Sequence, residues 1–313
     1  MLAVIAHRGA SGYLPEHTLA AKALAHGQGA HFIEQDVVLT KDDVPIVLHD
    51  IHLDTVSDVA ARFPDRKRDD GRFYAIDFTL AEIRTLAAHE RISLKTGDPV
   101  FAGRFPHGRA HFTIPTLAEE LELIAGLNTS TGRIAGIYPE IKAPAFHRAE
   151  GKDISRIVIA VLAEFGYVTK QDPVYLQSFD WNEVQRIRSE LGYAGRLVQL
   201  FGENDWNIAP DVDYDHLKSA AGMAEIAAVA DGIGPWIGQV AQAPEGGRPQ
   251  STGLAEAAHE RSLEVHPYTF RADALPKYAA SLDELLQLFL VEIGVDGVFT
   301  DFPDLGVAFV QSR

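Results

Sequence analysis

The sequence contains no cysteine, which excludes disulfide bonds and thiolate metal sites. It has no apolar run approaching the roughly 18 residues that a membrane-spanning helix needs, so we expect no stable membrane insertion. Basic residues are also scarce, because 28 Lys and Arg against 44 Asp and Glu give a net charge of −16. This charge argues against nucleic acid or an anionic membrane as the main partner, and any phosphate site must carry its own positive charge.

A signal peptide is not visible either. Residues 1–6 are too short for the apolar part of a leader and continue directly into a motif. The lack of cysteine does not by itself indicate the cytosol. We therefore expect a periplasmic or secreted protein if a leader has been removed, and a cytoplasmic one otherwise. The oligomeric state stays open between monomer and dimer.

A short apolar run, a loop and an amphipathic helix recur along the chain. The runs predict strands over 2–7, 31–36, 134–140, 173–177, 195–200, 227–233, 262–267 and 295–300. The clearest helix covers 154–165, where apolar residues follow a 3.6-residue period after the capping residue Asp153. Eight such units predict one (β/α)₈ (TIM) barrel domain over 1–313. A doubly wound open sheet is the alternative.

Other helices and two interruptions complete this pattern. Helices are expected to begin at Pro15, at Asp180, near 216, at Ser281 and at 303. Two β-runs within 37–49 surround Lys41-Asp42-Asp43 and predict a hairpin. Residues 50–115 form an insertion with one short helix, which begins at the capping sequence Thr79–Glu82. The insertion is expected over the barrel mouth, where it could shape substrate access.

Carboxylates stand at the ends of two predicted strands, which is where a barrel of this kind places its active site. Glu34 and Asp36 are two residues apart, so both side chains point to the same side of their strand. Glu140, on the next barrel strand, adds a third carboxylate. Three carboxylates suit a hard divalent cation, Ca²⁺ or Mg²⁺. The alternative is a solvated acidic rim with Arg or Lys partners.

Two histidines are predicted to reach the same carboxylates. His7 ends the first strand. If the hairpin turn is centred near Asp42, the numbers of paired residues sum to about 85, and His49 then lies across from Asp36. Because three carboxylates already suit a hard ion, the two histidines are interpreted as an acid/base pair rather than as ligands. Either histidine alone could instead simply be hydrogen-bonded at a strand end.

Positive charge and pocket residues complete the predicted site. Arg8 and Lys142 supply the local charge that an anionic substrate needs, and the whole set fits phosphoryl transfer. A weaker group could contact substrate or simply be exposed or packed: His17, Gln177, Trp236 and Tyr268.

These residues lie in segments that together resemble the glycerophosphodiester phosphodiesterase family, most closely its bacterial periplasmic branch. The segments are HRGASGYLPEHT, IEQDVVLTKDDVPIVLHD, YPEIKAP, YLQSFD, ADGIGP, VHPYTFR and GVFTDFPD. The resemblance runs from Ile5 to about Asp304. It implies a TIM barrel with the insertion after the HD motif, one divalent cation (Ca²⁺ expected, Mg²⁺ as the alternative) and hydrolysis of glycerophosphodiesters such as glycerophosphocholine or glycerophosphoethanolamine to sn-glycerol 3-phosphate and an alcohol.

The resemblance also assigns roles residue by residue. It matches the family's catalytic histidines to His7 and His49, its metal carboxylates to Glu34, Asp36 and Glu140, and its phosphate contacts to Arg8 and Lys142. The chain departs from the wider family's PENT sequence, because His17 replaces Asn, and it reads HPYTFR where many members carry Trp. Both departures bear on headgroup range rather than on the chemistry.

Three other functions stay open at this point. A lysophospholipase D or phospholipid lyase on the same barrel would need an apolar groove for an acyl chain. A metal-dependent sugar isomerase would use carboxylates and a histidine without needing Arg8 and Lys142 together. A non-catalytic surface binding protein would not need the pair His7 and His49.

Overall fold

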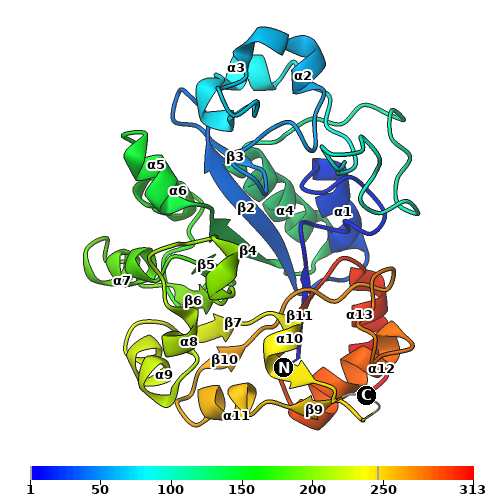
Figure 1. The fold of residues 1–313 in the computed structure, drawn as a ribbon, viewed down its shortest axis with the longest axis vertical. Helices are drawn as coiled ribbons and strands as arrows, with labels where there is room; N and C mark the ends of the chain where they lie inside the picture. Colours follow the sequence, from blue (N-terminus) through cyan, green and yellow to red (C-terminus); the bar gives the residue numbers. More distant parts are fainter. Residues whose placement is uncertain (1, 245–246) are drawn as a thin grey trace.

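The computed structural model describes residues 2–244 and 247–313. Eight parallel strands follow one another in the order β10-β7-β6-β5-β4-β2-β1-β11, which confirms the predicted barrel (Figure 1). The strands are β1 (Ala3–Ala6), β2 (Phe32–Leu39), β4 (Gly136–Ile141), β5 (Tyr175–Ser178), β6 (Arg196–Leu200), β7 (Gly232–Gly234), β10 (Glu264–Val265) and β11 (Gly297–Thr300). Backbone bonds from Asp296 N to Val265 O (3.0 Å) and from Phe299 N to Pro267 O (3.1 Å) join the two end strands and close the barrel.

Helices surround this barrel. They are α1 (Leu19–Gly27), α4 (Leu117–Thr131), α5 (Pro144–Ala149), α6 (Ile154–Glu164), α7 (Trp181–Ser189), α8 (Tyr214–Leu217), α9 (Ala220–Ala227), α10 (Ile237–Val240), α11 (Leu254–His259), α12 (Leu282–Leu286) with a π-helical continuation over Gln287–Ile293, and α13 (Pro303–Gln311). A two-residue pair, β8 (Ala241–Gln242) and β9 (Gln250–Ser251), lies beside α10 and α11. Within the described ranges, none of these helices has the length and apolar character needed to cross a bilayer.

Two helix predictions need correction. The first helix begins at Leu19 and not at Pro15, because the Thr18 hydroxyl accepts the Ala21 N–H and fixes the N-terminus there. Helix α4 lies where the sequence pattern placed no helix. Its capping box of Thr116 and Glu119 repeats the Thr-Leu-Ala-Glu sequence that correctly marked α3 (Leu80–Ile83).

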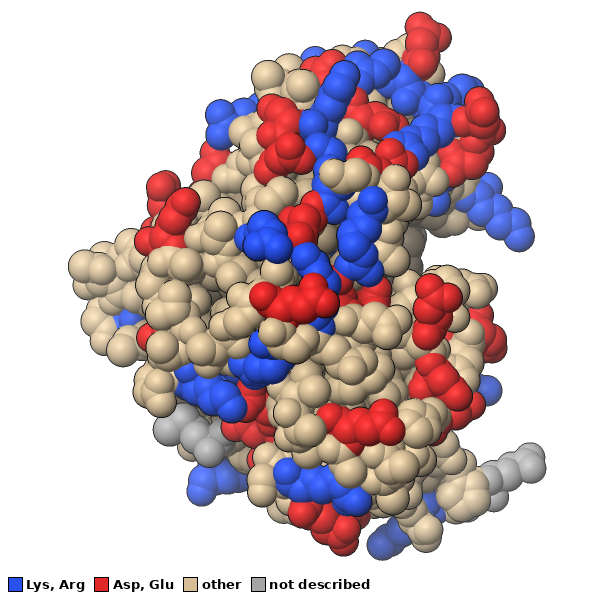
Figure 2. All heavy atoms as spheres, turned by 90° about the vertical axis from the view of Figure 1, so that its left-hand side faces the viewer, with Lys and Arg blue, Asp and Glu red and all other residues tan. Residues whose placement is uncertain are grey.

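The insertion over 50–115 contains more structure than the one predicted helix. It carries α2 (Val59–Arg62), α3 and two 3₁₀ turns, η1 (Pro64–Arg66) and η2 (Ala75–Asp77), and it forms the upper lobe of Figure 1. Its residues Leu53, Phe78 and Leu86 pack in an apolar cluster that also includes Val38 and Ile46 of the hairpin. Basic and acidic side chains lie side by side over this part of the surface in Figure 2. The insertion is thus a packed lobe held in part by ion pairs, such as Arg66 with Glu82.

The hairpin forms, but its register differs by one residue from the prediction. Strand β3 (Pro45–Val47) pairs antiparallel with β2, and the numbers of paired residues sum to 84. The turn is centred on Asp42 itself, whose carboxylate accepts the Thr40 hydroxyl at 2.7 Å. Leu48, and not His49, therefore lies across from Asp36, to whose carbonyl oxygen it donates its N–H at 2.8 Å.

Candidate active site

Three buried carboxylates meet at the carboxyl end of two neighbouring barrel strands. Glu34 and Asp36 lie on β2, and the parallel register places Glu140 of β4 beside Asp36. One oxygen from each of the three lies within 4.8 Å of the others, an arrangement that could hold a metal ion. The Oδ1 atom of Asp36 is buried, and no residue in the described ranges hydrogen-bonds to it. This set of oxygen donors suits a hard cation.

The pKa shifts of the three carboxylates also favour a bound cation. Burial and the negative charge of Asp36 raise the pKa of Glu34 well above its usual range. Burial also raises the pKa of Glu140 to about 8, with Lys142 opposing the shift and Asp36 adding to it. The pKa of Asp36 is lowered despite burial, because Lys142 and His17 stabilise its charged form. Without a cation, this cluster retains protons at neutral pH that a divalent ion could replace.

His7 is held by a carboxylate from the last barrel strand's end. Its Nδ1–H donates to Asp301 Oδ1 at 2.6 Å, because an ionised carboxylate can only accept. The other ring nitrogen, Nε2, is therefore free of the proton and lies 3.9 Å from Glu34 Oε2. Burial lowers the pKa of His7 to about 4. The ring is thus a neutral imidazole with its basic nitrogen toward the carboxylate cluster.

His49 is arranged in the same manner on the other side. Its Nδ1–H donates to Asp50 Oδ1 at 2.6 Å. Burial, with the positive charges of Arg8 and Lys142, lowers the pKa of His49 to about 4. Although His49 is not the ladder partner of Asp36, it follows the end of β3 and lines the same cavity as His7.

The two predicted cations also lie at this cavity. Lys142 Nζ is 2.8 Å from Glu140 Oε1, and the backbone N–H of Arg8 donates to Glu34 Oε2 at 2.7 Å. The Arg8 guanidinium lies 3.0 Å from both oxygens of Glu16 and 3.7 Å from Asp36 Oδ2. Both cations therefore stand beside the carboxylates, in a position to offset negative charge there.

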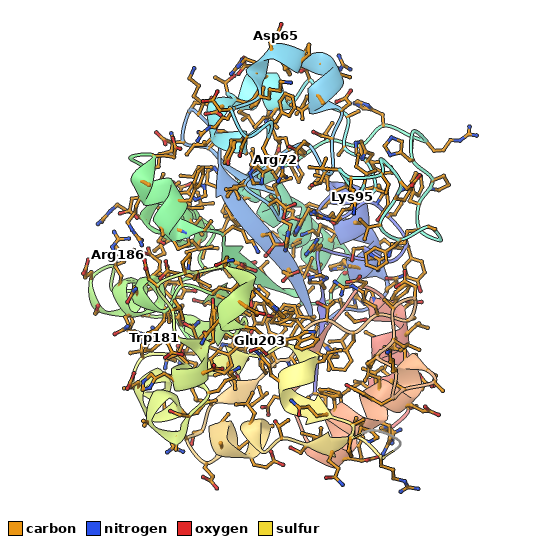
Figure 3. All side chains as sticks on the ribbon, in the orientation of Figure 1. Asp65, Arg72, Lys95, Trp181, Arg186 and Glu203 are labelled. Atoms are coloured by element: carbon orange, nitrogen blue, oxygen red, sulfur yellow. The ribbon has the colours of Figure 1, made fainter. Side chains whose placement is uncertain are left out.

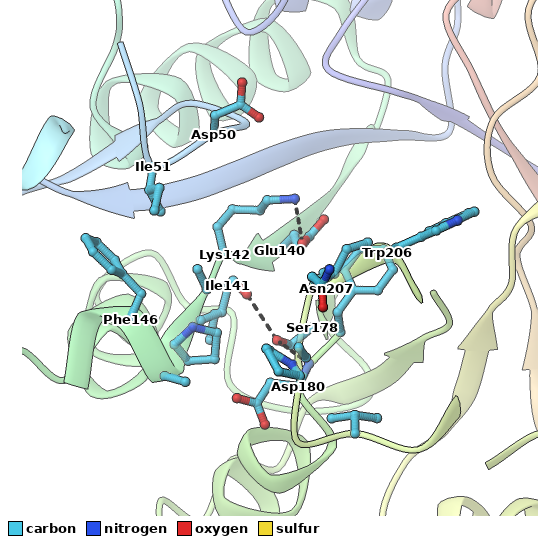
Figure 4. A pocket seen from close by; sticks show the side chains of 18 of the residues that line it. Asp50, Ile51, Glu140, Ile141, Lys142, Phe146, Ser178, Asp180, Trp206 and Asn207 are labelled. Carbon is cyan, nitrogen blue, oxygen red and sulfur yellow. Dashed lines mark hydrogen bonds and ion pairs between the residues drawn. The ribbon is translucent and has the colours of Figure 1, made fainter. Parts of the chain in front are cut away.

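Two adjoining cavities meet at these residues. The smaller, of about 250 Å³, contains the histidines, the carboxylates and the side chains of Gln177, Trp236 and Tyr268. The larger, of about 580 Å³, extends past Lys142 between α5 and the loop of residues 206–212. Figure 4 shows Phe146 and Trp206 on opposite sides of it, with Lys142 pointing to Glu140 between them. Both cavities share the walls His49, Glu140, Lys142, Phe179 and Trp206.

The weaker predicted residues fall into two groups. Gln177 Nε2 donates to Glu34 Oε1 at 3.3 Å, and the Tyr268 hydroxyl donates to the Phe201 carbonyl at 2.5 Å. Trp236 is 39% exposed and lines the smaller cavity. His17 instead lies behind the carboxylates, buried, with Nε2 at 2.7 Å from Asp36 Oδ2. It therefore contacts a carboxylate of the cluster rather than the open cavity.

Several residues of this region were not found from the sequence. Lys22 is fully buried and donates to the Glu34 carbonyl while pairing with Glu120 at 2.5 Å. Arg91 and Arg104 reach in from the insertion. These residues stand in helices or irregular loops, where no strand-end position or spacing marks them. The repeated charge of the insertion was the only available signal.

Comparison with known proteins places the chain among described relatives. The model of the glycerophosphoryl diester phosphodiesterase family matches residues 7–305. The chain is 46% identical to a glycerophosphodiester phosphodiesterase of Haemophilus influenzae, over 98% of this chain and 89% of that protein.

Two solved structures share the fold. A Silicibacter pomeroyi protein described as a glycerophosphoryl diester phosphodiesterase has a TM-score of 0.73 at 23% identity, covering 100% of this chain and 94% of its own. An Oleispira antarctica phosphodiesterase, solved with its product sn-glycerol-3-phosphate, has a TM-score of 0.66 at 21% identity, covering 99% and 96%. The family match and the identity to the Haemophilus protein cover nearly the whole chain. The chain therefore belongs to the glycerophosphoryl diester phosphodiesterase family and is an enzyme of that class, a phosphoric diester hydrolase.

Proposed function

We propose that this enzyme hydrolyses glycerophosphodiesters such as glycerophosphocholine and glycerophosphoethanolamine to sn-glycerol 3-phosphate and an alcohol, using one divalent cation and two histidines. The observation that carries the proposal is the convergence of His7, His49 and the three carboxylates on one cavity. The product bound to the Oleispira antarctica protein supports the same product here.

Glu34, Asp36 and Glu140 are the proposed ligands of the cation, with Ca²⁺ expected and Mg²⁺ as the alternative. Their pure oxygen character favours both ions over softer metals. Once bound, the cation would supply charge that stabilises the transferring phosphoryl group. His17 would support the site indirectly, since its ring N–H holds Asp36 from behind.

His7 and His49 are the proposed acid/base pair. In each ring Nδ1–H is bound to an aspartate, so Nε2 is the atom available to the substrate. Neutral rings can accept a proton from the nucleophile at pH 7. The ring that donates to the leaving alkoxide must first be protonated, and a phosphodiester anion bound beside it favours that form.

The two cavities suggest where the two parts of the substrate bind. We assign the glycerol moiety to the smaller cavity, with Gln177, Trp236 and Tyr268 around it, and the leaving alcohol to the larger one. The phosphate would then lie at the shared wall, beside Lys142. Arg8 would offset its charge from the opposite side of the carboxylates.

The nucleophile is proposed to be the glycerol 2-hydroxyl, which would form a cyclic phosphate that water then opens. Direct attack by water is the competing route. A 2-deoxy analogue of glycerophosphocholine separates them, because it lacks the attacking hydroxyl. The proposal expects its turnover to be lost, and turnover at the normal rate would favour direct attack.

The release of glycerol 3-phosphate from glycerophosphocholine tests the whole proposal. We expect activity with Ca²⁺, loss with a chelator, and a fall of about 10²- to 10⁴-fold for His7→Ala and for His49→Ala, the usual contribution of a general acid or base. His216→Ala is the matched control, because this histidine is exposed and pairs with Glu225. Undiminished activity in either of the first two variants would contradict the acid/base assignment.

A further inference from the structure

One arginine of the insertion, Arg104, reaches the carboxylate that holds His7. Asp301 uses its two oxygens differently: Oδ1 accepts from His7, and Oδ2 accepts from Arg104 Nη2 at 2.6 Å and from Arg271 Nε at 2.8 Å. Only 5% of the Arg104 side chain is exposed. Arg104 also binds both oxygens of Asp273, at 2.9 and 3.1 Å. It therefore ties the insertion to the last part of the barrel at the carboxylate behind His7.

A second arginine of the insertion reaches the carboxylate that holds His49. Asp50 Oδ1 accepts from His49, and Asp50 Oδ2 accepts from Arg91 Nη1 at 2.5 Å and from the Thr55 hydroxyl at 3.1 Å. Arg91 also donates to both oxygens of Glu16, at 2.7 and 3.0 Å. Through Glu16, Arg91 is connected to Arg8 as well.

The two arrangements share one chemical logic. An arginine on the outer oxygen fixes the plane of the carboxylate and keeps it ionised, so the inner oxygen can only accept. The imidazole must then carry its proton on Nδ1, which leaves Nε2 basic and facing the cavity. Without the arginine, the carboxylate could rotate or take a proton, and the histidine could adopt the other tautomer.

We propose that Arg91 and Arg104 are positioning residues, through which the insertion orients His49 and His7 respectively. This inference rests on the proposed function, because it assumes that both histidines take part in proton transfer. It gives the insertion a role in catalysis apart from shaping access. Because Asp301 has a second guanidinium partner, Arg271, and Asp50 has none among the described residues, the loss of Arg91 should cost more than the loss of Arg104.

The test combines kinetics with the ¹⁵N chemical shifts of the imidazole nitrogens in the full-length enzyme. For Arg104→Gln we expect kcat for glycerophosphocholine to fall about 10- to 100-fold with little change in KM, the usual effect of removing a supporting partner. The signals of His7 should move away from those of a fixed Nδ1–H tautomer, while those of His49 stay in place. Arg91→Gln should also lower kcat, but it should move the signals of His49 and leave those of His7 in place. Arg104→Lys, which keeps the charge, should recover part of kcat.

Arg72→Gln is the matched control. Arg72, labelled in Figure 3, belongs to the same insertion and also binds a buried aspartate, Asp54, through two bonds of 2.8 Å, but neither residue hydrogen-bonds to His7 or His49. It should leave kcat and both histidine signals unchanged. An unchanged kcat in both test variants would overturn the inference, and so would equal movement of both histidines in every insertion variant. If His7→Ala and His49→Ala kept full activity, the proposed function itself would fail, a result separate from these.

Discussion

His17 contacts a carboxylate of the proposed cation site from outside the cavity. Its Nε2–H donates to Asp36 Oδ2, and the side chain is buried. We expect His17→Ala to weaken Ca²⁺ binding about 10- to 100-fold, because the carboxylate loses the donor that orients it. His17→Asn should recover part of the affinity, since an amide N–H can replace the donor. Isothermal titration calorimetry of the metal-free variants measures both effects.

A control separates this effect from the removal of any buried histidine. His147 lies on α5, is buried, and accepts the Leu39 N–H without hydrogen-bonding to any of the three carboxylates. His147→Ala should therefore leave Ca²⁺ affinity unchanged even if it lowers stability. Equal affinities in His17→Ala and the wild type would refute the supporting role of His17.

At this scale the sequence predicted the residues whose position depends on a strand. Glu34, Asp36 and Glu140 follow from the two-residue spacing and the barrel rule, and the structure brings them together. The contact of His17 with Asp36 depends instead on a loop in which Arg8 and His17 adopt positive φ angles of 58° and 61°. Residues other than Gly rarely adopt this backbone conformation, and nothing in the sequence around Arg8 or His17 predicts it.

Capping boxes mark two elements equally well, although only one of them was predicted. Thr79 begins the four-residue α3, and Thr116 begins the fifteen-residue α4, each with a glutamate three residues later that completes the box. We expect Thr79→Ala and Thr116→Ala each to lower the free energy of unfolding by about 1 kcal/mol, because an N–H at the helix start loses its partner.

Urea unfolding measures these changes. The variants Thr79→Ser and Thr116→Ser keep a hydroxyl acceptor and should retain most of the stability. Alanine variants as stable as the wild type would show that the boxes contribute nothing here.

Register is the other lesson of the element scale. The sequence indicated a hairpin around Asp42 but not whether the turn is centred on a residue or between two residues. That choice shifts every pair by one and decides which side chain faces Asp36. His49 still reaches the cavity because β3 ends at Val47 and its backbone bonds to β2 stop after that of Leu48, so the pairing no longer sets the direction of later side chains. The arginines of the insertion act across long sequence separations, which no local pattern encodes.

On the scale of the whole molecule, the buried histidines set a common pH dependence. Burial lowers the pKa of His7, His49 and His266 to about 4 and that of His17 to about 3. Below about pH 6.5 the histidines of the unfolded chain bind protons, whereas the buried rings of the native protein stay neutral down to about pH 4. The free energy of unfolding should therefore rise with pH across this window, whether or not a cation is bound.

The buried carboxylates change the free energy of unfolding with pH in the opposite direction. Burial keeps protons on Glu34 and Glu140, whose pKa is raised, to about 8 for Glu140, whereas the unfolded chain loses them near pH 4.5. Stability from these groups is present at low pH and is lost as pH rises toward 8. A cation that replaces the protons removes this loss.

The difference in Tm between Ca²⁺-saturated and metal-free protein should therefore grow from pH 5 to pH 8. The histidine contribution is common to both forms and cancels in this difference. Thermal unfolding at each pH, with free Ca²⁺ held constant, measures it. Glu140→Gln removes one of the titrating groups and should make the difference in Tm less dependent on pH. In the wild type, a difference in Tm that stays constant with pH would mean that the cation does not compete with protons for these carboxylates.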